Sequence, residues 1–434
     1  MPPVSFTGLA IVAAVAFLVP LALGLAPRLR LPATVVEIVA GIVIGPAGLR
    51  WVGVDTPIGI MSLLGLAFLL FLAGLEIRFD RLRGRVLRDA GLGFAISLAL
   101  AVPIGVGFGA LGLVKSPLLV AIILSATALG IVIPLLKDAG ELSSPFGQVV
   151  TAGATIAEFG TIILLSLFFS RAAHGVGAQL VLLGEILVLG AVVTLVVVRV
   201  ERLRPFAAVL VRLQDTTAQI RVRGAFVLLA VFAALAESLG LEVILGAFIA
   251  GTILTLVDRD VMMTHPQFRA KLEAIGFGVF VPFFFVGSGL RFDLAALFAS
   301  PSTLARVPLF LAALLVVRGA PALLYRSSQS GRRAAAAGLL QATSLTFIVA
   351  STQIGRALGL IGAATAAALV AAGLLSVLIF PLVALTLLRQ PERPGADSPA
   401  PTTAAAPEGV SPGSAGRGHM DRLSQTSKGD VRRA

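Results

Sequence analysis

The chain has 434 residues, of which 57% are hydrophobic and only 13% are charged, and its mean hydropathy is +1.01. This composition excludes a soluble globular protein, and the absence of cysteine excludes disulfides, thiolate metal sites and cysteine nucleophiles. The net charge of +12 does not indicate nucleic-acid binding, because the basic residues lie in short segments between apolar runs and no basic stripe is interleaved with aromatic residues.

Thirteen apolar runs follow one another along the chain, and most of them are long enough for an α-helix to cross a bilayer. The sequence therefore predicts an all-α polytopic membrane protein with thirteen transmembrane helices. Strand-like segments of about ten residues with alternating hydrophobicity, which outer-membrane barrels require, are absent. The predicted helices lie near residues 4–26, 33–49, 57–76, 90–113, 117–136, 146–170, 176–198, 224–239, 241–257, 273–290, 304–325, 334–353 and 360–388.

The distribution of basic residues between the apolar runs predicts the orientation of the chain. With the amino terminus outside, the connections that face the cytoplasm carry most of the Lys and Arg residues, and the opposite orientation would break the positive-inside rule at nearly every connection. The odd number of spans then places the carboxyl terminus in the cytoplasm. We expect a multi-pass protein of the cell (inner) membrane, in contact with membrane lipids.

The chain changes character at Gln390. Pro, Ala, Gly, Ser and Thr dominate residues 390–434, charges are scattered and apolar periodicity is lost, which is typical of a disordered segment. We therefore expect a membrane domain over residues 1–389 and a disordered cytoplasmic tail over residues 390–434. The basic residues of this tail either touch anionic lipid or are only solvated.

Glu158 is the most informative residue, because it lies near the middle of the apolar run 149–169. A carboxylate at that depth costs about 2.5–3.5 kcal/mol on insertion scales unless it faces water or a partner, and such residues mark ion pathways or proton relays. We interpret Glu158 as a site that binds a proton and a metal cation in turn. The alternative is a protonated Glu158 that only packs one helix against another.

Two of the predicted helices contain interruptions. The stretches SATALGIVIP at 125–134 and GLLQATSLT at 338–346 place small, hydroxyl-bearing and helix-breaking residues within a span. Each belongs to a trio of spans, over residues 86–170 and 304–388, and the odd number of spans between the starts of the trios gives them opposite orientations. Inverted repeats with two crossed broken helices are typical of secondary transporters. Taken alone, each cluster also fits interhelical packing of small residues.

Arg318 is the only basic residue well inside a predicted span. It lies in the repeat opposite to that of Glu158, so we expect the two charges to meet in the core, where the guanidinium would hold the bundle together. The alternative is that Arg318 extends toward a membrane interface, which its distance from both ends of the span argues against.

Other polar residues within the spans carry weaker signals. Glu37 in the second span, Glu185 in the seventh span and Ser344 in the second interruption are candidate pathway residues, whereas helix capping or interface contacts explain Glu76. No soluble catalytic motif is present, so we expect neither an enzyme nor a cofactor. The histidines all lie in predicted loops or in the tail, where they cannot build an intramembrane relay: His174, His265 and His419.

Several stretches resemble the monovalent cation:proton antiporter-2 family, and they occur in the family's order. The run PATVVEIVAGIVIGP at 32–46 resembles the signature of the second span, and LFLAGLE at 70–76 is followed by basic residues as in the family. The stretch 125–140 resembles the first broken helix, and PFFFVGSGL at 282–290 resembles the phenylalanine-rich tenth span. The similarity covers about residues 5–388.

The resemblance implies a homodimer in which a rigid dimerisation domain supports a mobile core domain, and the core carries the ion by an elevator movement driven by the proton gradient. It assigns Glu158 to the cation-binding acid, Arg318 to the basic residue on the facing repeat, and Thr127 to a hydroxyl near the ion. Together with Ser125 and unwound carbonyls, Glu158 and Thr127 would supply the oxygen ligands of a bound Na⁺ or K⁺.

One position departs from the family pattern. Many relatives carry an acidic or amide residue directly before the binding acid, whereas this chain has Ala157. With a single titrating acid, we expect one proton to exchange for one monovalent cation, which makes transport electroneutral.

The sequence thus predicts a secondary active antiporter that exchanges Na⁺ or K⁺ for protons and serves pH homeostasis. Three other classes remain open. An organic-anion/sodium symporter shares paired broken helices but needs a larger polar cavity, an ion channel would pass far larger currents, and a membrane sensor would show no flux.

Overall fold

The computed structural model describes residues 6–25, 31–77, 84–169, 176–201, 216, 219–257, 268–327 and 329–389. Every regular element in these ranges is a helix. The chain divides into two units, Met1–Gln390 and Pro391–Ala434, and all described residues belong to the first. The predicted tail over 390–434 and the three histidines therefore lie outside the described residues.

The first half of the chain forms helices α1 to α8. Their bounds are α1 Phe6–Leu25, α2 Ala33–Ile44, α3 Thr56–Leu75, α4 Gly84–Ala110, α5 Pro117–Leu124, α6 Leu129–Asp138, α7 Pro145–Phe169 and α8 Val176–Glu201.

The second half begins with α10 and contains one π-helical and one 3₁₀ segment, η1 and η2. The bounds are α10 Ile220–Ser238, α11 Val243–Val257, α12 Phe268–Ile275, η1 Gly276–Phe280, α13 Val281–Leu290, α14 Leu294–Phe298, α15 Pro301–Gly319, η2 Ala320–Ser327, α16 Gly331–Gln341, α17 Thr346–Ala357 and α18 Ala363–Arg389.

Nine helical stretches among the described residues are long and apolar enough to cross a membrane, when the joined pairs such as α5–α6 and α16–α17 are taken as one. Three shorter apolar helices accompany them, including α2 and α11. With 12 and 15 residues, α2 and α11 fall short of the about 20 residues that a straight span needs. The structure therefore supports a polytopic helical protein, while the count of thirteen spans stays a prediction.

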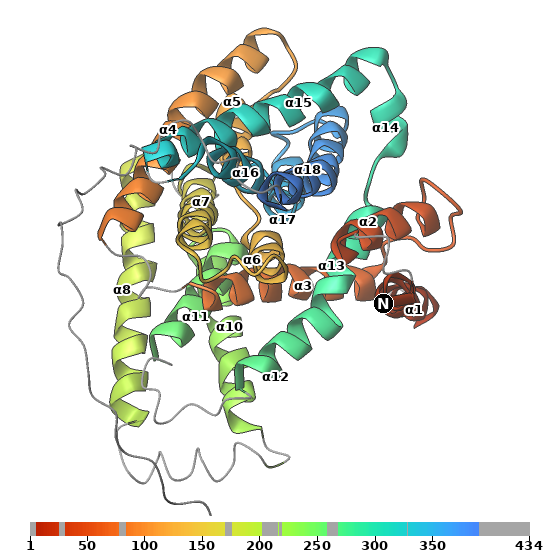
Figure 1. The fold of residues 1–434 in the computed structure, drawn as a ribbon. Helices are drawn as coiled ribbons and strands as arrows, with labels where there is room; N and C mark the ends of the chain where they lie inside the picture. The colour runs from red at the N-terminus through yellow and green to blue at the C-terminus, as the bar shows by residue number, and fades with distance from the viewer. Residues whose placement is uncertain are drawn as a thin grey trace, which may run out of the picture. The chain divides into compact units, whose positions relative to one another are not determined.

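Contacts between helices separate two groups. In the α3 group, α3 packs on α11 and α13, α2 packs on α13, and α1, α10 and α12 complete the group. In the α7 group, α4 packs on α5 and α7, and α18 packs on α15, α16 and α17. Figure 1 shows the α7 group in the upper half of the view and most of the α3 group below it, with α7 in contact with α8 and α11.

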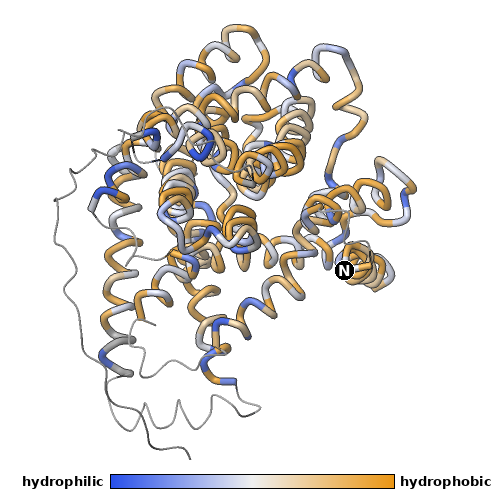
Figure 2. Tube along the Cα trace, in the orientation of Figure 1, coloured by the Kyte–Doolittle hydropathy of each residue, from blue (hydrophilic) through white to orange (hydrophobic). Residues whose placement is uncertain are grey.

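Hydrophobic side chains cover these helices on the inside and the outside alike. Figure 2 shows hydrophobic residues along most helices and hydrophilic residues gathered near helix ends and connections. Large apolar side chains remain exposed at mid-helix positions, such as Phe17 at 66% and Val188 at 64%. A helix that is apolar all round is expected in a bilayer, where lipid covers the outer face.

Local capping explains where several helices begin. The Asp55 carboxylate accepts a hydrogen bond from the Ile58 amide at 3.0 Å, and Pro57 occupies the first turn of α3. The Ser300 hydroxyl accepts from the Thr303 amide at the start of α15. These side chains satisfy amides that have no partner within their own helix.

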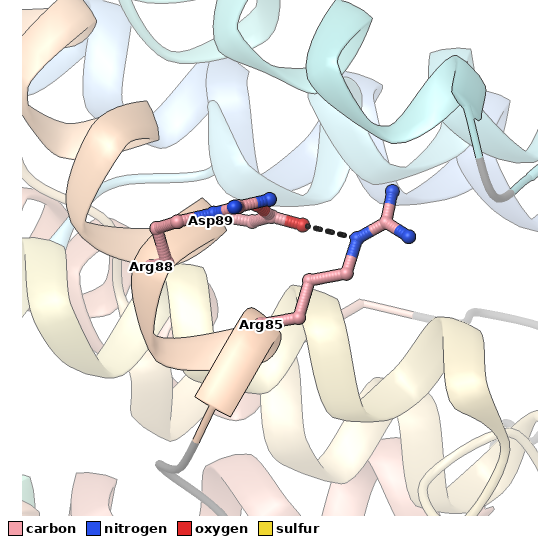
Figure 3. Close-up of polar contacts among 3 residues, drawn as sticks. All are labelled: Arg85, Arg88 and Asp89. Carbon is pink, nitrogen blue, oxygen red and sulfur yellow. Dashed lines mark hydrogen bonds and ion pairs between the residues drawn. The ribbon is translucent and has the colours of Figure 1, made fainter.

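Ion pairs between described residues lie near helix ends rather than in the core. Figure 3 shows one of them at the start of α4, where Asp89 accepts from Arg85 at 3.4 Å and pairs with Arg88 at 3.3 Å. The Arg85 side chain is 63% exposed, so this pair contributes at most about 0.5 kcal/mol. Such pairs do not determine the fold.

Candidate functional site

Two helices of the α7 group are interrupted where the sequence predicts it. Helix α5 ends at Leu124 and α6 begins at Leu129, while α16 ends at Gln341 and α17 begins at Thr346. The interruptions touch, because the Ala128 amide donates to the Thr343 carbonyl at 2.9 Å. Figure 1 places α6, α7, α16 and α17 close together near the centre.

Glu158 of α7 lies beside the first interruption. Its carboxylate accepts a hydrogen bond from the Leu129 amide, the first residue of α6, at 3.0 Å. The side chain is 6% exposed. The amino end of a helix attracts anions, so α6 stabilises a charged carboxylate at this depth. Among the described residues this is the one hydrogen bond to the carboxylate, and it fills one of about four acceptor positions. The other positions remain for a proton or a cation.

Arg318 of α15 is 1% exposed and contacts the first interruption through Thr127. Its guanidinium donates to the Thr127 hydroxyl at 2.8 Å and to the Ser97 hydroxyl at 2.8 Å. It also donates to the Gly153 carbonyl at 3.3 Å. Among the described residues no ion pair joins Arg318 to Glu158, so the expected meeting of the two charges is replaced by hydroxyl and carbonyl contacts.

Thr127 connects the two interrupted helices. Its hydroxyl donates to the Gln341 carbonyl at 2.6 Å while it accepts from Arg318. One acceptor position of the hydroxyl remains for another group. The hydroxyl of Thr127 therefore has a structural role, because it links α5–α6 to α16–α17.

Gln341 and Tyr325 extend this buried network, and the sequence analysis did not single them out. The Gln341 amide donates to the Tyr325 hydroxyl at 2.9 Å. Gly153 permits their close approach to α7, since a Cβ there would lie 2.5 Å from Gln341 Nε2 and 3.0 Å from the Tyr325 oxygen. Tyr325 is the only tyrosine of the chain, and its place near a helix end in an apolar sequence was the available signal.

The other predicted hydroxyls lie nearby but point elsewhere. The Ser125 hydroxyl donates to the Ala121 carbonyl of its own helix at 2.9 Å. The Ser344 backbone is held by the Ser376 hydroxyl, and the Ser344 Oγ is buried without a hydrogen-bond partner among the described residues. Both serines line the interruptions, and in the described part of the chain neither forms a hydrogen bond with Glu158.

The remaining acidic residues differ in how close they lie to Glu158. Glu185 is exposed on α8, and Glu37 is buried on α2, which packs mainly on α13 and α1. Glu76 at the end of α3 lies close enough to Glu158 for their charges to interact. One Glu76 oxygen is buried without a hydrogen-bond partner among the described residues. The structure thus brings Glu76, rather than Glu37 or Glu185, to the neighbourhood of Glu158.

A cavity of about 820 Å³ reaches the first turn of α6. Its wall includes Gly130 and Ile131, which directly follow the Leu129 amide that binds Glu158. Thr34 of α2 and Glu141 line it as well, so the cavity lies between the α3 group and the α7 group. We call it the α6 cavity.

Comparisons with known proteins show what the chain resembles. The family model described as "Sodium/hydrogen exchanger, transmembrane" matches residues 13–390. The chain is 32% identical to YjbQ of Bacillus subtilis, which carries the name of a Na(+)/H(+) antiporter, over 91% of this chain and 65% of YjbQ. This chain therefore spans less than two thirds of that relative's length. A Methanocaldococcus jannaschii protein with the name of a Na(+)/H(+) antiporter is 28% identical over 86% of this chain and 94% of its own.

A solved structure shares the fold. The sodium proton antiporter MjNhaP1 of Methanocaldococcus jannaschii, determined at pH 8, superposes with a TM-score of 0.64 at 18% identity. The match covers 88% of this chain and 99% of the solved chain. The chain is accordingly a multi-pass helical membrane protein, and the resemblance to cation:proton antiporters that its motifs indicate is confirmed.

Proposed function

The chain belongs to the sodium/hydrogen exchanger family, and from this premise we propose that it is a secondary active antiporter that exchanges Na⁺ or K⁺ for protons at Glu158. The observation that carries the proposal is the position of the Glu158 carboxylate, buried beside two touching helix interruptions and bonded to the first amide of α6. The relatives named as antiporters support the same activity.

Competition for one carboxylate explains the exchange. A proton neutralises Glu158 directly, and a dehydrated cation neutralises it when oxygen atoms replace its water. We propose that carbonyls of the interrupted segments and the remaining acceptor position of the Thr127 hydroxyl supply further neutral oxygens to the cation. Ser125 and Ser344 line the same interruptions. Glu76 lies near enough that its carboxylate, when ionised, would attract a cation toward the site.

Alternating access follows from the electrostatics of a buried charge. A bare carboxylate is costly to move through an apolar environment, whereas the proton-loaded and cation-loaded states are neutral. We propose that the α7 group is a mobile core and the α3 group a dimerisation scaffold, with trios 86–170 and 304–388 as inverted repeats. The α6 cavity between the groups supports such a boundary. Movement of the core past the scaffold would be an elevator step.

We propose that the exchange is electroneutral because of the residue before Glu158. Ala157 is buried and has no group that binds a proton. Arg318 keeps its hydrogen bonds to Thr127, Ser97 and Gly153, so it supplies a fixed charge rather than a proton to be exchanged. One proton for one cation is then the expected stoichiometry.

The proposed setting is a homodimer in the cell (inner) membrane with its amino terminus outside. The positive-inside rule supports this orientation. The predicted thirteen spans, which agree with the opposite orientation of the two trios, require the carboxyl terminus in the cytoplasm.

Purified protein in liposomes with an interior pH dye tests the proposal. Addition of Na⁺ or K⁺ is expected to move protons, choline is expected to move none, and Glu158→Gln is expected to abolish the response. Glu185→Gln, an exposed acid on α8, is the matched control and keeps the response. Substantial exchange by a folded Glu158→Gln variant would contradict the assignment.

The same liposomes separate the other transport classes. A dependence of proton movement on an added organic anion would favour a symporter, and currents far above transporter turnover in planar bilayers would favour a channel. A response to an imposed membrane potential would contradict the one-for-one stoichiometry while leaving antiport intact.

A further inference from the structure

A second cavity, of about 600 Å³, also lies between the α3 group and the α7 group. Ser288 and Arg291 line it from the end of α13, and Thr352, Gln353 and Arg356 line it from α17. Its wall includes the first turns of α18, at Ala366, Ala367 and Val370, whereas the α6 cavity lies along the last turns of α18, from Val377 to Leu388. The two cavities therefore lie toward opposite ends of α18.

One side-chain hydrogen bond crosses between the groups in this second cavity. The Gln353 amide of α17 donates to the Ser288 hydroxyl of α13 at 2.9 Å. The Ser288 hydroxyl itself donates to the Phe284 carbonyl, so it is free to act only as an acceptor toward Gln353. The other side-chain hydrogen bonds of α17, from Ser351 and Thr352, stay within that helix.

Ser288 is firmly attached to the α3 group. Helix α13 packs on α2 and α3 through glycines: a Cβ at Gly289 would lie 2.1 Å from the Ile38 carbonyl, and a Cβ at Gly287 would lie 2.2 Å from the Ser62 hydroxyl oxygen. The Ser62 hydroxyl also donates to the Phe283 carbonyl. Gln353 moves with α17, which packs on α18 and α5. The Gln353–Ser288 bond therefore joins the two groups directly.

Charge makes this end of α18 unfavourable for a cation. Two guanidinium groups, Arg291 and Arg356, line the second cavity. The Asp293 carboxylate accepts from the Ala296 amide and so caps α14. A cation meets a net positive cavity wall here, which opposes its entry.

We propose that Gln353 and Ser288 form a latch that closes the second cavity and biases the protein toward the conformation open at the α6 cavity. This inference rests on the proposed function, because the latch matters only if the two groups move past each other. Among the described residues, the Gln353–Ser288 bond is the one side-chain hydrogen bond between α13 and α17, and the apolar contacts around it are non-directional. The Gln353–Ser288 bond is directional, so it favours one position of α17 over another. Losing it changes the ratio of the conformation closed at the second cavity to the conformation open there by about fivefold.

Cysteine labelling measures that shift without requiring transport. The chain contains no cysteine, so a single introduced thiol is the only one present. Val349→Cys reports on the second cavity, and Ile131→Cys reports on the α6 cavity. Both side chains are buried, at 2% and 8% exposed, so their reaction with a polar maleimide in detergent depends on opening.

Gln353→Leu and Ser288→Ala each remove the latch, and Thr352→Val is the matched control. The Thr352 hydroxyl lines the same cavity but donates only to Val349 of its own helix. Each latch variant is expected to increase the labelling rate at Val349→Cys about fivefold and to decrease it at Ile131→Cys. The double variant is expected to shift the rates no further than either single variant, and Thr352→Val leaves both rates unchanged.

The outcomes separate the latch from the transport proposal. Unchanged rates in both latch variants, equal effects of Thr352→Val, or rates that rise together at both reporters would overturn the latch. If the rates move in opposite directions as expected while alkali cations cause no proton movement in liposomes, the latch stands and the antiporter function fails. If Glu158→Gln abolishes exchange while latch variants label like the unaltered protein, the function stands and the latch fails.

Discussion

Glu158 and Arg318 are both charged residues deep among the helices, yet their surroundings differ. Glu158 has one backbone hydrogen bond, from the Leu129 amide, and keeps 6% of its surface exposed. Arg318 is 1% exposed and donates to two hydroxyls, a backbone carbonyl and the Gln341 side-chain oxygen, which lie on four other segments of the chain. The Glu158 carboxylate keeps unfilled hydrogen-bond acceptor positions, whereas the Arg318 guanidinium has several hydrogen-bond acceptors around it.

This difference separates a site that binds from a residue that holds the structure together. A carboxylate with open acceptor positions gains from a proton or a cation, whereas a guanidinium with its donors directed at Thr127, Ser97 and Gly153 has little left to offer a ligand. A fixed buried cation also stays close to its partners, because a lost bond leaves buried polar groups unpaired. We therefore expect Arg318 to determine stability and Glu158 to determine ligand response.

The largest expected effect is on stability when Arg318 is removed. Arg318→Ala leaves the Ser97 hydroxyl without its hydrogen-bond partner and opens a cavity, so we expect a loss of about 3 kcal/mol, seen as a lower Tm in detergent. Arg326→Ala, at an exposed position of η2, is the control and should change stability by less than about 0.5 kcal/mol. A Tm for Arg318→Ala equal to that of the unaltered protein would remove its structural role.

Cation binding should stabilise the protein through Glu158. At a Na⁺ concentration one hundred times the Kd, the folded state gains about 2.7 kcal/mol, which raises Tm. Glu158→Gln is expected to abolish this gain while folding normally, because a neutral amide oxygen still accepts from the Leu129 amide. Glu185→Gln should respond like the unaltered protein, and choline should stabilise neither. A Na⁺ response that survives Glu158→Gln would place the cation elsewhere.

The pH dependence of cation affinity tests whether proton and cation share Glu158. Where protons occupy the site, each unit of lower pH should raise the apparent Kd for Na⁺ about tenfold, or about 1.4 kcal/mol, because the ligand must be deprotonated to bind the cation. Exchange measured across a pH series gives this slope. An apparent Kd that stays constant while only the maximal rate changes would mean that the two ions bind separate groups.

The smallest effect is expected at the outer part of the Arg318 network. Tyr325→Phe removes the hydroxyl that accepts from Gln341, so we expect a loss of about 1 kcal/mol in stability with cation affinity unchanged. Thermal unfolding and exchange assays on the same sample check both. A change in cation affinity at normal stability would contradict this structural role and would assign Tyr325 to the ion site.

Much of the site could be predicted from the sequence, because the position of a buried acid and of a helix interruption depends on neighbouring residues. An isolated acid within an apolar run and hydroxyl clusters within two spans predicted the places of Glu158 and the interruptions, and α5 and α16 do end there. The partners of Arg318 were not predictable in the same way. Thr127 and Ser97 are 191 and 221 residues away, so no local pattern records those contacts.

The position of Glu76 near Glu158 was likewise not predictable from the local sequence. Its place at the end of an apolar run fits helix capping, and nothing in the neighbouring residues distinguishes capping from a role near Glu158. The packing of α3 against α11, and of α11 against α7, brings Glu76 at the end of α3 within electrostatic range of Glu158. Glu185 is the converse case, a mid-helix acid that the packing leaves exposed.

The sequence by itself determined that the chain is a helical membrane protein, that an acid lies within the apolar run of α7 and where two helices break. Hydropathy and helix propensity act over one or two turns, so neighbouring residues suffice to predict them. The tertiary structure alone decided which groups satisfy Arg318, which second acid approaches Glu158 and which hydrogen bond joins α13 to α17. These contacts arise because buried polar groups must find partners among segments that become neighbours only when the helices pack.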